Sequence, residues 1–266
     1  MKKRPPIPCS LASFFHRAAA SLRQCRTAVE SLLFPWSCPG CADPVPYPDV
    51  ICAPCASGLP RIQAPLCKRC GSPIPELWRV RVCPDCRATR SPLSRVRSCY
   101  LYEGLVRQMI RDAKFHRHAR LLRRFSGDMY VLSRAEFPSR IEAVVPVPLH
   151  REREWERTFN QAELMARDLS LWWGIPLWTG LWRIQRTPAQ SGLSGAARRR
   201  NLKDAFVVPR DGVPGTILLV DDVITTGATL EACARALRRK GARRVYAVTI
   251  ARAVLRRGTP KSRIPP

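Results

Sequence analysis

The stretch from Thr216 to Thr229 constrains the fold more than any other part of this chain. It begins with an apolar, β-prone run at 216–220, which predicts a buried strand. Two adjacent carboxylates, Asp221 and Asp222, follow at the carboxyl end of that strand. A short loop of small residues and a helical pattern come next. This order predicts a strand–loop–helix unit that holds a phosphorylated ribose.

The loop supplies groups that suit a phosphate. Its small residues are Thr225, Thr226, Gly227, Ala228 and Thr229. Because a helix begins here, its free backbone N–H groups and the positive end of its dipole favour an anion. The helix is predicted from apolar residues at helical spacing and a glycine stop, namely Leu230, Cys233, Ala234, Leu237 and Gly241. The carboxylates of Asp221 and Asp222, called the acid pair below, are acceptors for sugar hydroxyls.

Other strand–loop–helix motifs fit this segment less well. A P-loop needs a Lys after the loop glycine, and none follows Gly227. A dinucleotide-binding fingerprint needs three glycines, and the segment has one. A phosphoacceptor receiver domain needs several more strand–helix units downstream, but only one more strand, at 245–251, is expected. Simple helix capping is disfavoured because two adjacent like charges repel each other.

Residues 96–253 alternate between strand and helix patterns, which predicts an α/β domain with a parallel sheet. Further strands are expected at 97–102, 141–148 and 204–208, and helices at 104–114 and 157–171, the latter starting near Asn160. Since ligands bind at the carboxyl ends of parallel strands, 146–157 should lie beside the acid pair. The arginines of that segment suit a pyrophosphate. The Arg-rich loop 186–202 is interpreted as a lid over bound substrate or as a nucleic-acid contact.

Eight of the twelve cysteines form four CxxC pairs within 36–90. The pairs are Cys38/Cys41, Cys52/Cys55, Cys67/Cys70 and Cys83/Cys86. Two CxxC turns complete one tetrahedral Cys₄ zinc site, so the spacing predicts two structural zinc ions. The simplest assignment is sequential, and an interleaved pairing stays open. Because this Pro-rich segment has little periodic apolar pattern, metal would supply its folding free energy.

The remaining cysteines, Cys9, Cys25, Cys99 and Cys233, are interpreted as small buried apolar residues. A redox role for one CxxC pair is a minor alternative. Four such pairs indicate metal binding and a reducing compartment, so a cytoplasmic location is expected.

The charge balance is strongly basic, with 46 Lys+Arg against 20 Asp+Glu and a net charge of +26. This excess favours an anionic partner, which could be nucleic acid, a phosphorylated substrate or a membrane surface. No apolar run is long enough for a transmembrane helix. Residues 1–35 are interpreted as a basic leader or helix rather than an export signal, and 254–266 as a basic disordered tail.

The segment Val220–Thr229 resembles the motif by which type I phosphoribosyltransferases bind phosphoribosyl pyrophosphate (PRPP). The resemblance implies that the acid pair holds the ribose 2′ and 3′ hydroxyls and that the Thr225–Thr229 loop holds the 5′-phosphate. It also implies Mg²⁺ bound together with PRPP. The fold class expected is therefore α/β, a parallel-sheet domain of the type I phosphoribosyltransferase kind preceded by a small Cys-rich double zinc ribbon at 36–90.

From about Cys38 to Arg252 the chain resembles the ComF family, which includes GntX-like proteins. The resemblance is carried by the four CxxC pairs, Lys114-Phe115, Val145–Pro148, Asn160-Gln161, Gln190, Leu193, Arg200-Asn201, Phe206 and the PRPP motif. The family usually has Gly where this chain has Thr158. A β-carbon therefore stands where the backbone is expected to approach substrate or to take a positive φ.

The ComF resemblance implies a cytoplasmic role in DNA uptake and natural transformation, with single-stranded DNA and competence or DNA-processing proteins as partners. The leading hypothesis is a PRPP-binding phosphoribosyltransferase-family protein that acts on or with single-stranded DNA. A second hypothesis is a nucleic-acid-binding competence factor whose PRPP site senses ligand without turnover. A third is a free-base salvage enzyme. The sequence identifies no general base that would indicate the acceptor. The hypotheses are therefore separated by whether pyrophosphate is released from PRPP in the presence of nucleic acid or of a free base.

Overall fold

The computed structural model describes residues 36–46, 48–115, 119–185, 202, 204–209 and 211–253. Its contacts divide the chain into two units between Gly58 and Leu59, within the Cys-rich segment 36–90. The predicted leader, the predicted tail and nearly all of the Arg-rich loop lie outside the described residues. So do the resemblance residues Gln190, Leu193, Arg200 and Asn201.

The described part of the first unit contains little regular structure. Strands β1 (Trp36–Ser37) and β2 (Pro44–Val45) pair in antiparallel register, and α2 spans Ala53–Ser57. Pro54 lies in the first turn of α2, where its missing N–H costs nothing. Strands of two residues bury almost no core, so this unit needs another source of folding free energy.

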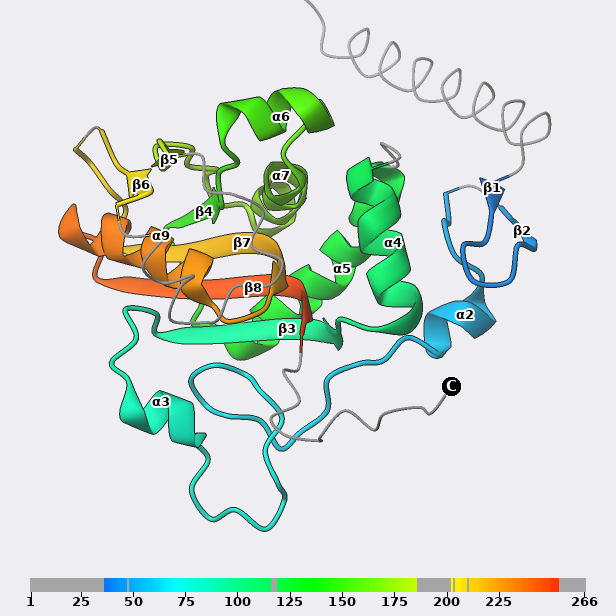
Figure 1. The fold of residues 1–266 in the computed structure, drawn as a ribbon, viewed down its shortest axis with the longest axis horizontal. Coiled ribbons are helices and arrows are strands. Elements are labelled where there is room, and N and C mark those ends of the chain that lie inside the picture. Colours follow the sequence, from blue (N-terminus) through cyan, green and yellow to red (C-terminus); the bar gives the residue numbers. More distant parts are fainter. Residues whose placement is uncertain are drawn as a thin grey trace, which may run out of the picture. The chain divides into compact units, whose positions relative to one another are not determined.

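The second unit is built on a four-stranded sheet in the order β3-β8-β7-β4, and all three pairings are parallel (Figure 1). Its strands are β3 (Arg95–Leu101), β8 (Arg244–Arg252), β7 (Thr216–Ile224) and β4 (Ala143–Pro146). Parallel neighbours require long crossovers, which here carry helices. The predicted α/β domain with a parallel sheet is therefore confirmed.

Helices cover both faces of this sheet. The main ones are α4 (Gly104–Phe115), α5 (Ala119–Glu136), α7 (Gln161–Trp173) and α9 (Ala228–Arg239). The short α6 (Arg151–Arg157) buries no residue. Figure 1 shows α9 in front of the sheet and α5 behind it, and α7 packs against α5, β4 and β7. The apolar stripe predicted for α9 is confirmed, since Leu230, Cys233, Ala234 and Leu237 are all buried.

Helix α5 and strand β6 differ from the sequence-based expectation, and the short helix α6 was likewise not predicted. The 18-residue α5 had no predicted counterpart, although Leu121, Phe125 and Met129 bury a helical stripe along it. The strand expected at 204–208 shortens to β6 (Phe206–Val207), which pairs with β5 (Trp182–Arg183) outside the main sheet. Propensity cannot say which sheet a short strand joins.

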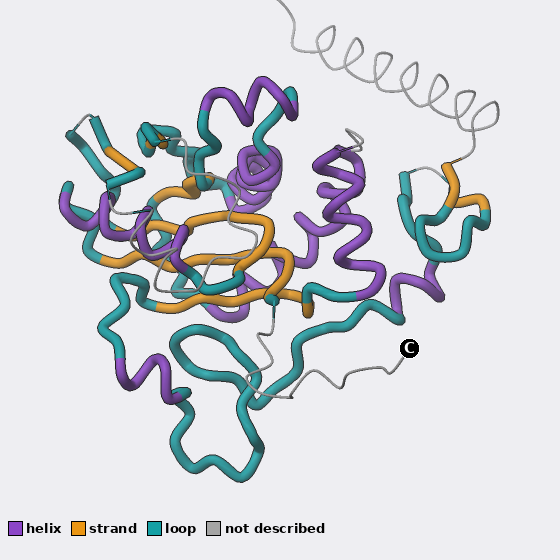
Figure 2. The backbone as a smooth tube through the Cα atoms, in the orientation of Figure 1, coloured by secondary structure: helices purple, strands orange, loops and turns teal. Residues whose placement is uncertain are grey.

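The outer edge of β3 is covered by chain that precedes it. Figure 2 shows the segment before β3 running mostly as loop, apart from α3 (Pro84–Ala88). Three backbone hydrogen bonds attach this loop to β3: Val96 N to Arg69 O at 2.8 Å, Ile62 N to Cys99 O at 3.0 Å and Leu101 N to Pro60 O at 2.8 Å. An edge strand covered in this way offers no free template for another chain.

Within the described part of the chain, every helix is too short or too polar to cross a lipid bilayer. Cys99 and Cys233 are buried, as predicted, while Cys9 and Cys25 belong to the undescribed leader.

Candidate functional site

The acid pair lies within β7 rather than after it, because the strand continues to Ile224. The continuation is held by β8, whose residues Thr249 and Arg252 pair with Asp221 and Ile224. The backbone N–H of Asp222 donates to Oδ1 of Asp221 at 2.9 Å. That bond restrains the Asp221 carboxylate against the backbone of the next residue.

The two carboxylates have different electrostatic surroundings. Burial raises the pKa of Asp221 to about 7, and the charge of Asp222 acts in the same direction, whereas Lys114 and Arg183 oppose the rise. Asp222 instead forms an ion pair with Lys114, whose Nζ lies 2.5 Å from Oδ2. Both side chains of this pair are largely buried. A cation at the acid pair would therefore reduce the electrostatic repulsion between the Asp221 and Asp222 carboxylates.

The Thr225–Thr229 loop, called the phosphate loop below, turns directly from β7 into α9. Gly227 is the N-cap of α9 and has φ 81, a region that favours glycine. The N–H of Ala228 lies 3.4 Å from the Thr226 hydroxyl, and Glu231 N donates to Gly227 O at 2.9 Å. The first backbone N–H groups of a 12-residue helix thus gather at the loop, where they favour an anion.

Of the segment 146–157, which was predicted to lie beside the acid pair, the structure places the first residues there. Pro146 pairs with Val220, the residue before Asp221, and Val147 N donates to Val220 O at 2.9 Å. Asn160 fixes this neighbour in place, because its amide donates to Val147 O at 3.1 Å while its carbonyl oxygen accepts from Ala162 N at the start of α7. The predicted helix start near Asn160 is confirmed by this cap.

Thr158 occupies the left-handed region, with φ 66 and ψ −10, at the C-terminus of α6. Of the two alternatives expected at this position, close approach to substrate or a positive φ, the structure shows the positive φ. A β-branched residue pays a steric cost there that glycine does not.

Replacing Thr158 with Gly should stabilise the protein. Relief of the left-handed strain, about 1–2 kcal/mol, exceeds the extra entropy of glycine in the unfolded chain, about 0.5–1 kcal/mol. We expect a net gain of up to about 1.5 kcal/mol, measured as the urea midpoint of unfolding. The control Thr158→Ser keeps the β-carbon and should show no gain. Equal midpoints for the Gly and Ser variants would contradict the strain argument.

Two residues that flank the acid pair were not among the predicted site residues. Lys114 lies in the last turn of α4 and reaches Asp222 from a distant part of the sequence. Its only sequence signal was the Lys114-Phe115 motif. Arg183 of β5 lies over the Phe206 ring at 5.5 Å, and its charge opposes the raised pKa of Asp221. Nothing in the local pattern around Arg183 indicated this contact.

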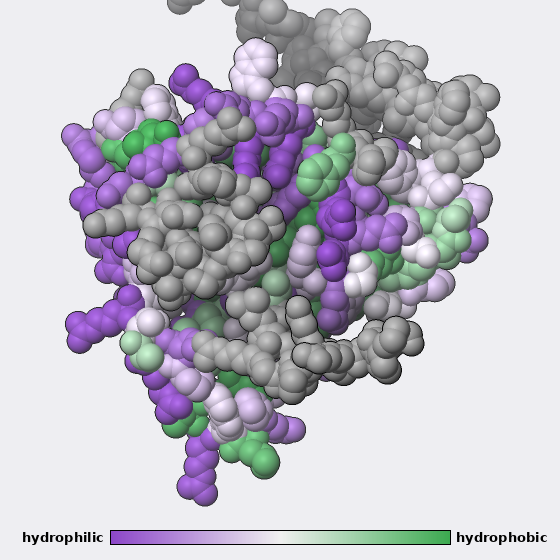
Figure 3. Space-filling model, in the orientation of Figure 1, coloured by the Kyte–Doolittle hydropathy of each residue, from purple (hydrophilic) through white to green (hydrophobic). Residues whose placement is uncertain are grey.

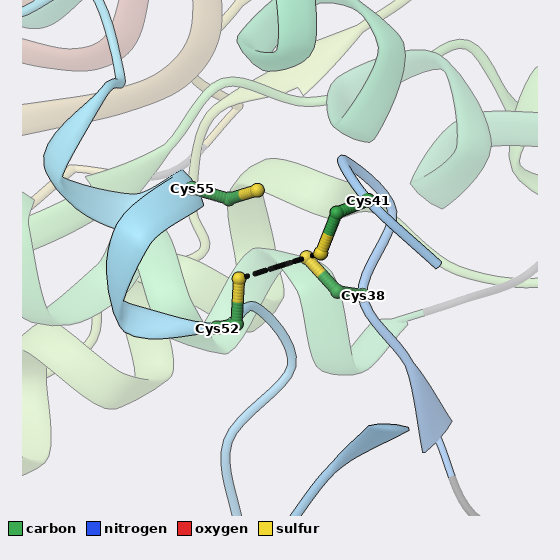
Figure 4. A group of neighbouring side chains, drawn as sticks. All are labelled: Cys38, Cys41, Cys52 and Cys55. Atoms are coloured by element: carbon green, nitrogen blue, oxygen red, sulfur yellow. Dashed lines mark hydrogen bonds between the residues drawn. The ribbon is translucent and has the colours of Figure 1, made fainter. Parts of the chain in front are cut away.

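The first cluster consists of Cys38, Cys41, Cys52 and Cys55, whose sulfur atoms all lie within 4.8 Å of one another. Figure 4 shows the first two on the turn after β1, with the other two at the start of α2, and all four side chains converge. Sγ of Cys52 lies 3.6 Å from Sγ of both Cys38 and Cys41. The backbone N–H of Gly40 points at Sγ of Cys38, 3.4 Å away. Such an N–H stabilises a thiolate.

The second cluster consists of Cys67, Cys70, Cys83 and Cys86, and its sulfur atoms also lie within 4.8 Å of one another. Gly71 completes its first turn at φ 72, with its N–H donating to Cys67 O at 2.9 Å. A β-carbon at Gly71 would lie 2.6 Å from Val96 O, so the turn packs directly on β3.

The donor sets of both clusters fit zinc. Each holds four cysteine sulfurs at mutual distances that one tetrahedral ion can bridge, with no position left for substrate. In the second cluster the buried Nε of Arg252 has no acceptor among the described residues, and zinc-bound thiolates would provide negative charge beside it. The two Cys₄ clusters are therefore consistent with two structural zinc ions.

Comparison with known families and proteins agrees with this arrangement. Residues 29–87 match the family of double zinc ribbon domains, and residues 211–263 match the family of phosphoribosyl transferase domains. The second match contains the acid pair, the phosphate loop and α9.

Several curated proteins are similar to the chain over much of its length. It is 32% identical over 200 residues to DNA utilization protein YhgH of Salmonella typhimurium, a match that covers 72% of this chain and 86% of that protein. It is 31% identical over 198 residues to competence protein ComFC of Bacillus subtilis, covering 72% and 79%. A match to competence protein F of Haemophilus influenzae is 43% identical over 116 residues, covering 42% of this chain and 51% of that protein. With a double zinc ribbon ahead of a phosphoribosyltransferase domain and relatives of this kind, the chain belongs to the ComF family.

Proposed function

We propose that the second unit binds PRPP at the phosphate loop and the acid pair. The observation that carries the proposal is the succession of two carboxylates on β7, a glycine turn, and the N-terminus of α9. Asp221 and Asp222 would accept hydrogen bonds from the ribose hydroxyls. Thr225, Thr226, Gly227, Ala228 and Thr229 would hold the 5′-phosphate through backbone N–H groups and hydroxyls.

The residues around this site also fit Mg²⁺. The ion prefers oxygen ligands and is bound in proteins through one or two carboxylates together with substrate phosphates. Asp221 and Asp222 are suitable donors, and the repulsion between them favours a cation. When bound, the ion would neutralise the pyrophosphate of PRPP. The charge of Lys114 now satisfies Asp222, so ligand binding would compete with that ion pair.

The reaction that such a site supports is pentosyl transfer. The bond from ribose C1 to pyrophosphate would break and a bond from C1 to an acceptor would form. The chain's own residues would hold the ribose by two hydroxyls and the 5′-phosphate, which fixes C1 relative to the incoming acceptor. The segment after β4 would lie next to the pyrophosphate, because Val147 is hydrogen-bonded to Val220.

We further propose that the protein acts in DNA uptake together with single-stranded DNA. Relatives named as competence proteins and DNA utilization proteins support this role. The net charge of +26 favours an anionic polymer. Hydrophilic side chains dominate the visible surface over α4 and α6 (Figure 3).

One face of α4 has the chemistry that a single strand requires. It lines a hollow of about 410 Å³ with Gly104, Arg107, Gln108, Arg111, Asp112 and Phe115. The two arginines are exposed, and Phe115 is 67% exposed. Guanidinium groups bind phosphates, and an exposed ring can stack on a base. The same helix delivers Lys114 to the acid pair, so a strand on this face would lie near the proposed PRPP site.

The deciding experiment asks whether pyrophosphate is released. Purified protein would be mixed with Mg²⁺ and PRPP, with and without an oligodeoxynucleotide or free bases, and pyrophosphate measured by a coupled enzymatic assay. Release that depends on the oligonucleotide would support a transferase acting on DNA. PRPP binding by calorimetry without any release would support a ligand sensor, the second hypothesis. Failure to bind PRPP at all would reject the proposed site.

Replacing Arg107 and Arg111 with Ala should weaken binding of single-stranded DNA and flatten its salt dependence. Each lost phosphate contact lowers the slope of log K against log salt by about 0.7, so we expect a decrease of about 1.4. Fluorescence anisotropy of a labelled oligothymidine at several salt concentrations measures this slope. The matched control Arg167→Ala with Arg243→Ala removes two exposed arginines elsewhere on the unit. Equal effects of the two double variants would contradict the assignment to α4.

A further inference from the structure

The last residue of β8, Arg252, connects the second cluster to the strand end that bears the phosphate loop. Its side chain is 7% exposed, which is unusual for an arginine. The Nη2 group donates to the carbonyl oxygen of Cys70, within the first CxxC turn of the second cluster. Nε is also buried and has no acceptor among the described residues. The guanidinium is therefore directed at the cluster and is only partly satisfied by it.

The charges of the cluster explain how this arginine remains buried. Burial lowers the pKa of Arg252, whereas Cys70, Cys86, Cys67 and Cys83 as thiolates raise it. Four thiolates around one zinc ion leave an excess of negative charge. A buried guanidinium needs such a counter-charge, because its desolvation is otherwise uncompensated. The second cluster in its metal-bound form thus stabilises Arg252 in this position.

The backbone of Arg252 leads directly to the phosphate loop. Arg252 pairs in register with Ile224 of β7 and with Leu101 of β3. Ala253 N, the next donor along the chain, donates to Ile224 O at 2.9 Å. Ile224 is the residue immediately before Thr225, where the phosphate loop begins. Arg252, which contacts the cluster, and Ile224, which precedes the loop, are therefore direct partners on neighbouring strands.

A second arginine strengthens the attachment of the cluster to the sheet. Arg97 of β3 is 6% exposed, and its Nε donates to Oε2 of Glu136 at 2.7 Å. Its Nη1 lies 3.4 Å from the carbonyl oxygens of both Cys67 and Lys68. The two arginines therefore reach the same CxxC turn from different strands. Only Arg252 also pairs with the strand that carries the acid pair.

We propose that Arg252 is a positioning residue that couples zinc binding at the second cluster to ligand binding at the phosphate loop. With zinc bound, the cluster would hold the Arg252 side chain through the Cys70 carbonyl and the charge of its thiolates. The end of β8 would then fix Ile224, and this strand end would order the loop that follows it. Because coupling between two binding sites is reciprocal, PRPP should in turn retain zinc in the second cluster. This inference rests on the proposed PRPP site, but the contact between Arg252 and the cluster does not.

The test uses the full chain with Arg252→Met, Arg252→Lys and the control Arg243→Lys, an exposed arginine just before β8. Zinc release to a chromogenic chelator and PRPP affinity by calorimetry are both measured. The first-cluster variant Cys41→Ser with Cys55→Ser identifies which release phase belongs to the second cluster. We expect Arg252→Met to accelerate that phase and to weaken PRPP binding, each by about tenfold, with Lys intermediate and the control unchanged. Saturating PRPP should slow the same phase in the unmodified protein.

Each other result overturns a defined part of the inference. Faster zinc release by Arg252→Met with unchanged PRPP affinity would reject the coupling between the two sites. It would still support a role for Arg252 in retaining zinc. Unchanged zinc release would show that the contact of Arg252 does not stabilise zinc in the second cluster, whatever the effect on PRPP affinity. If the unmodified protein binds no PRPP, the proposed function fails and the coupling fails with it, while the zinc-release comparison still reports on Arg252 and the cluster.

Discussion

Replacing both Asp221 and Asp222 with Asn should reduce the affinity for Mg²⁺-PRPP by about two to four orders of magnitude. A hydrogen bond to a charged group contributes about 1.5–3 kcal/mol, and two such bonds to the ribose would be weakened together. The carboxylates would also be lost as donors to the cation. Each single variant should lose roughly the square root of that factor if the two groups act independently, and less if one compensates for the other.

The loss of binding should not reflect loss of the fold. Burial and the charge of Asp222 raise the pKa of Asp221 from 3.8 to about 7. A raised folded-state pKa contributes stability that is fully present below pH 3.8 and is lost as the pH rises through about 7. At pH 8 the ionised Asp221 therefore destabilises the folded protein. An amide at this position removes that penalty, so Asp221→Asn should unfold at an equal or higher temperature and show a flatter pH dependence between pH 4 and 7.

Calorimetric titration with Mg²⁺-PRPP measures the predicted loss, and thermal unfolding at several pH values checks the fold. Asp211→Asn serves as the control, since this carboxylate is 94% exposed and pairs with Lys240 outside the site. Removing the partner of Lys114 makes Asp222→Asn the less stable single variant, because it leaves a largely buried ammonium unpaired. PRPP affinity within a factor of two of the unmodified protein would rule out the acid pair as the ribose site.

The core of the candidate site could be predicted because its parts are adjacent in the sequence. The buried strand, the acid pair, the loop and the helix follow one another within Thr216–Leu237, so local pattern and element periodicity are sufficient. The neighbouring segment after β4 could also be placed, because parallel strands present their carboxyl ends at one edge. The extension of β7 to Ile224 could not, since it depends on pairing with Arg252 of β8.

Residues that reach the site from other elements could not be predicted from local pattern. Lys114 meets Asp222 only after α4 has been packed beside the strand ends. Arg183 affects Asp221 from a two-residue strand outside the main sheet. Arg252 has the pattern of an ordinary strand-end arginine until the CxxC turn of Cys70 packs against it. Many of the described arginines are exposed and take no part in the site. The abundance of arginine in the sequence therefore could not single out Arg183 and Arg252.

Removing zinc from the second cluster should destabilise the second unit far more than removing zinc from the first cluster. Structural zinc sites contribute about 10–16 kcal/mol of apparent binding free energy at neutral pH, and that energy is available only to the fold that presents the ligands. The second cluster presents them within the unit that contains the sheet, whereas the first belongs to the unit that ends at Gly58. Loss of the second metal would also release the loop that covers the edge of β3.

The matched variants are Cys70→Ser with Cys86→Ser and Cys41→Ser with Cys55→Ser, each of which removes one ligand from both CxxC pairs of one cluster. Both should contain one zinc ion per chain instead of two, as measured by metal analysis. Even if only about 3–5 kcal/mol of the metal's contribution reaches the sheet, the second-cluster variant should unfold at least about 6 °C lower by calorimetry. The first-cluster variant should keep the main transition within about 2 °C, because none of the hydrogen bonds that attach the loop to β3 involves its cysteines. Equal decreases in unfolding temperature would mean that the two clusters stabilise the protein equally. The hydrogen bonds between β3 and the loop that carries the second cluster would then not affect stability.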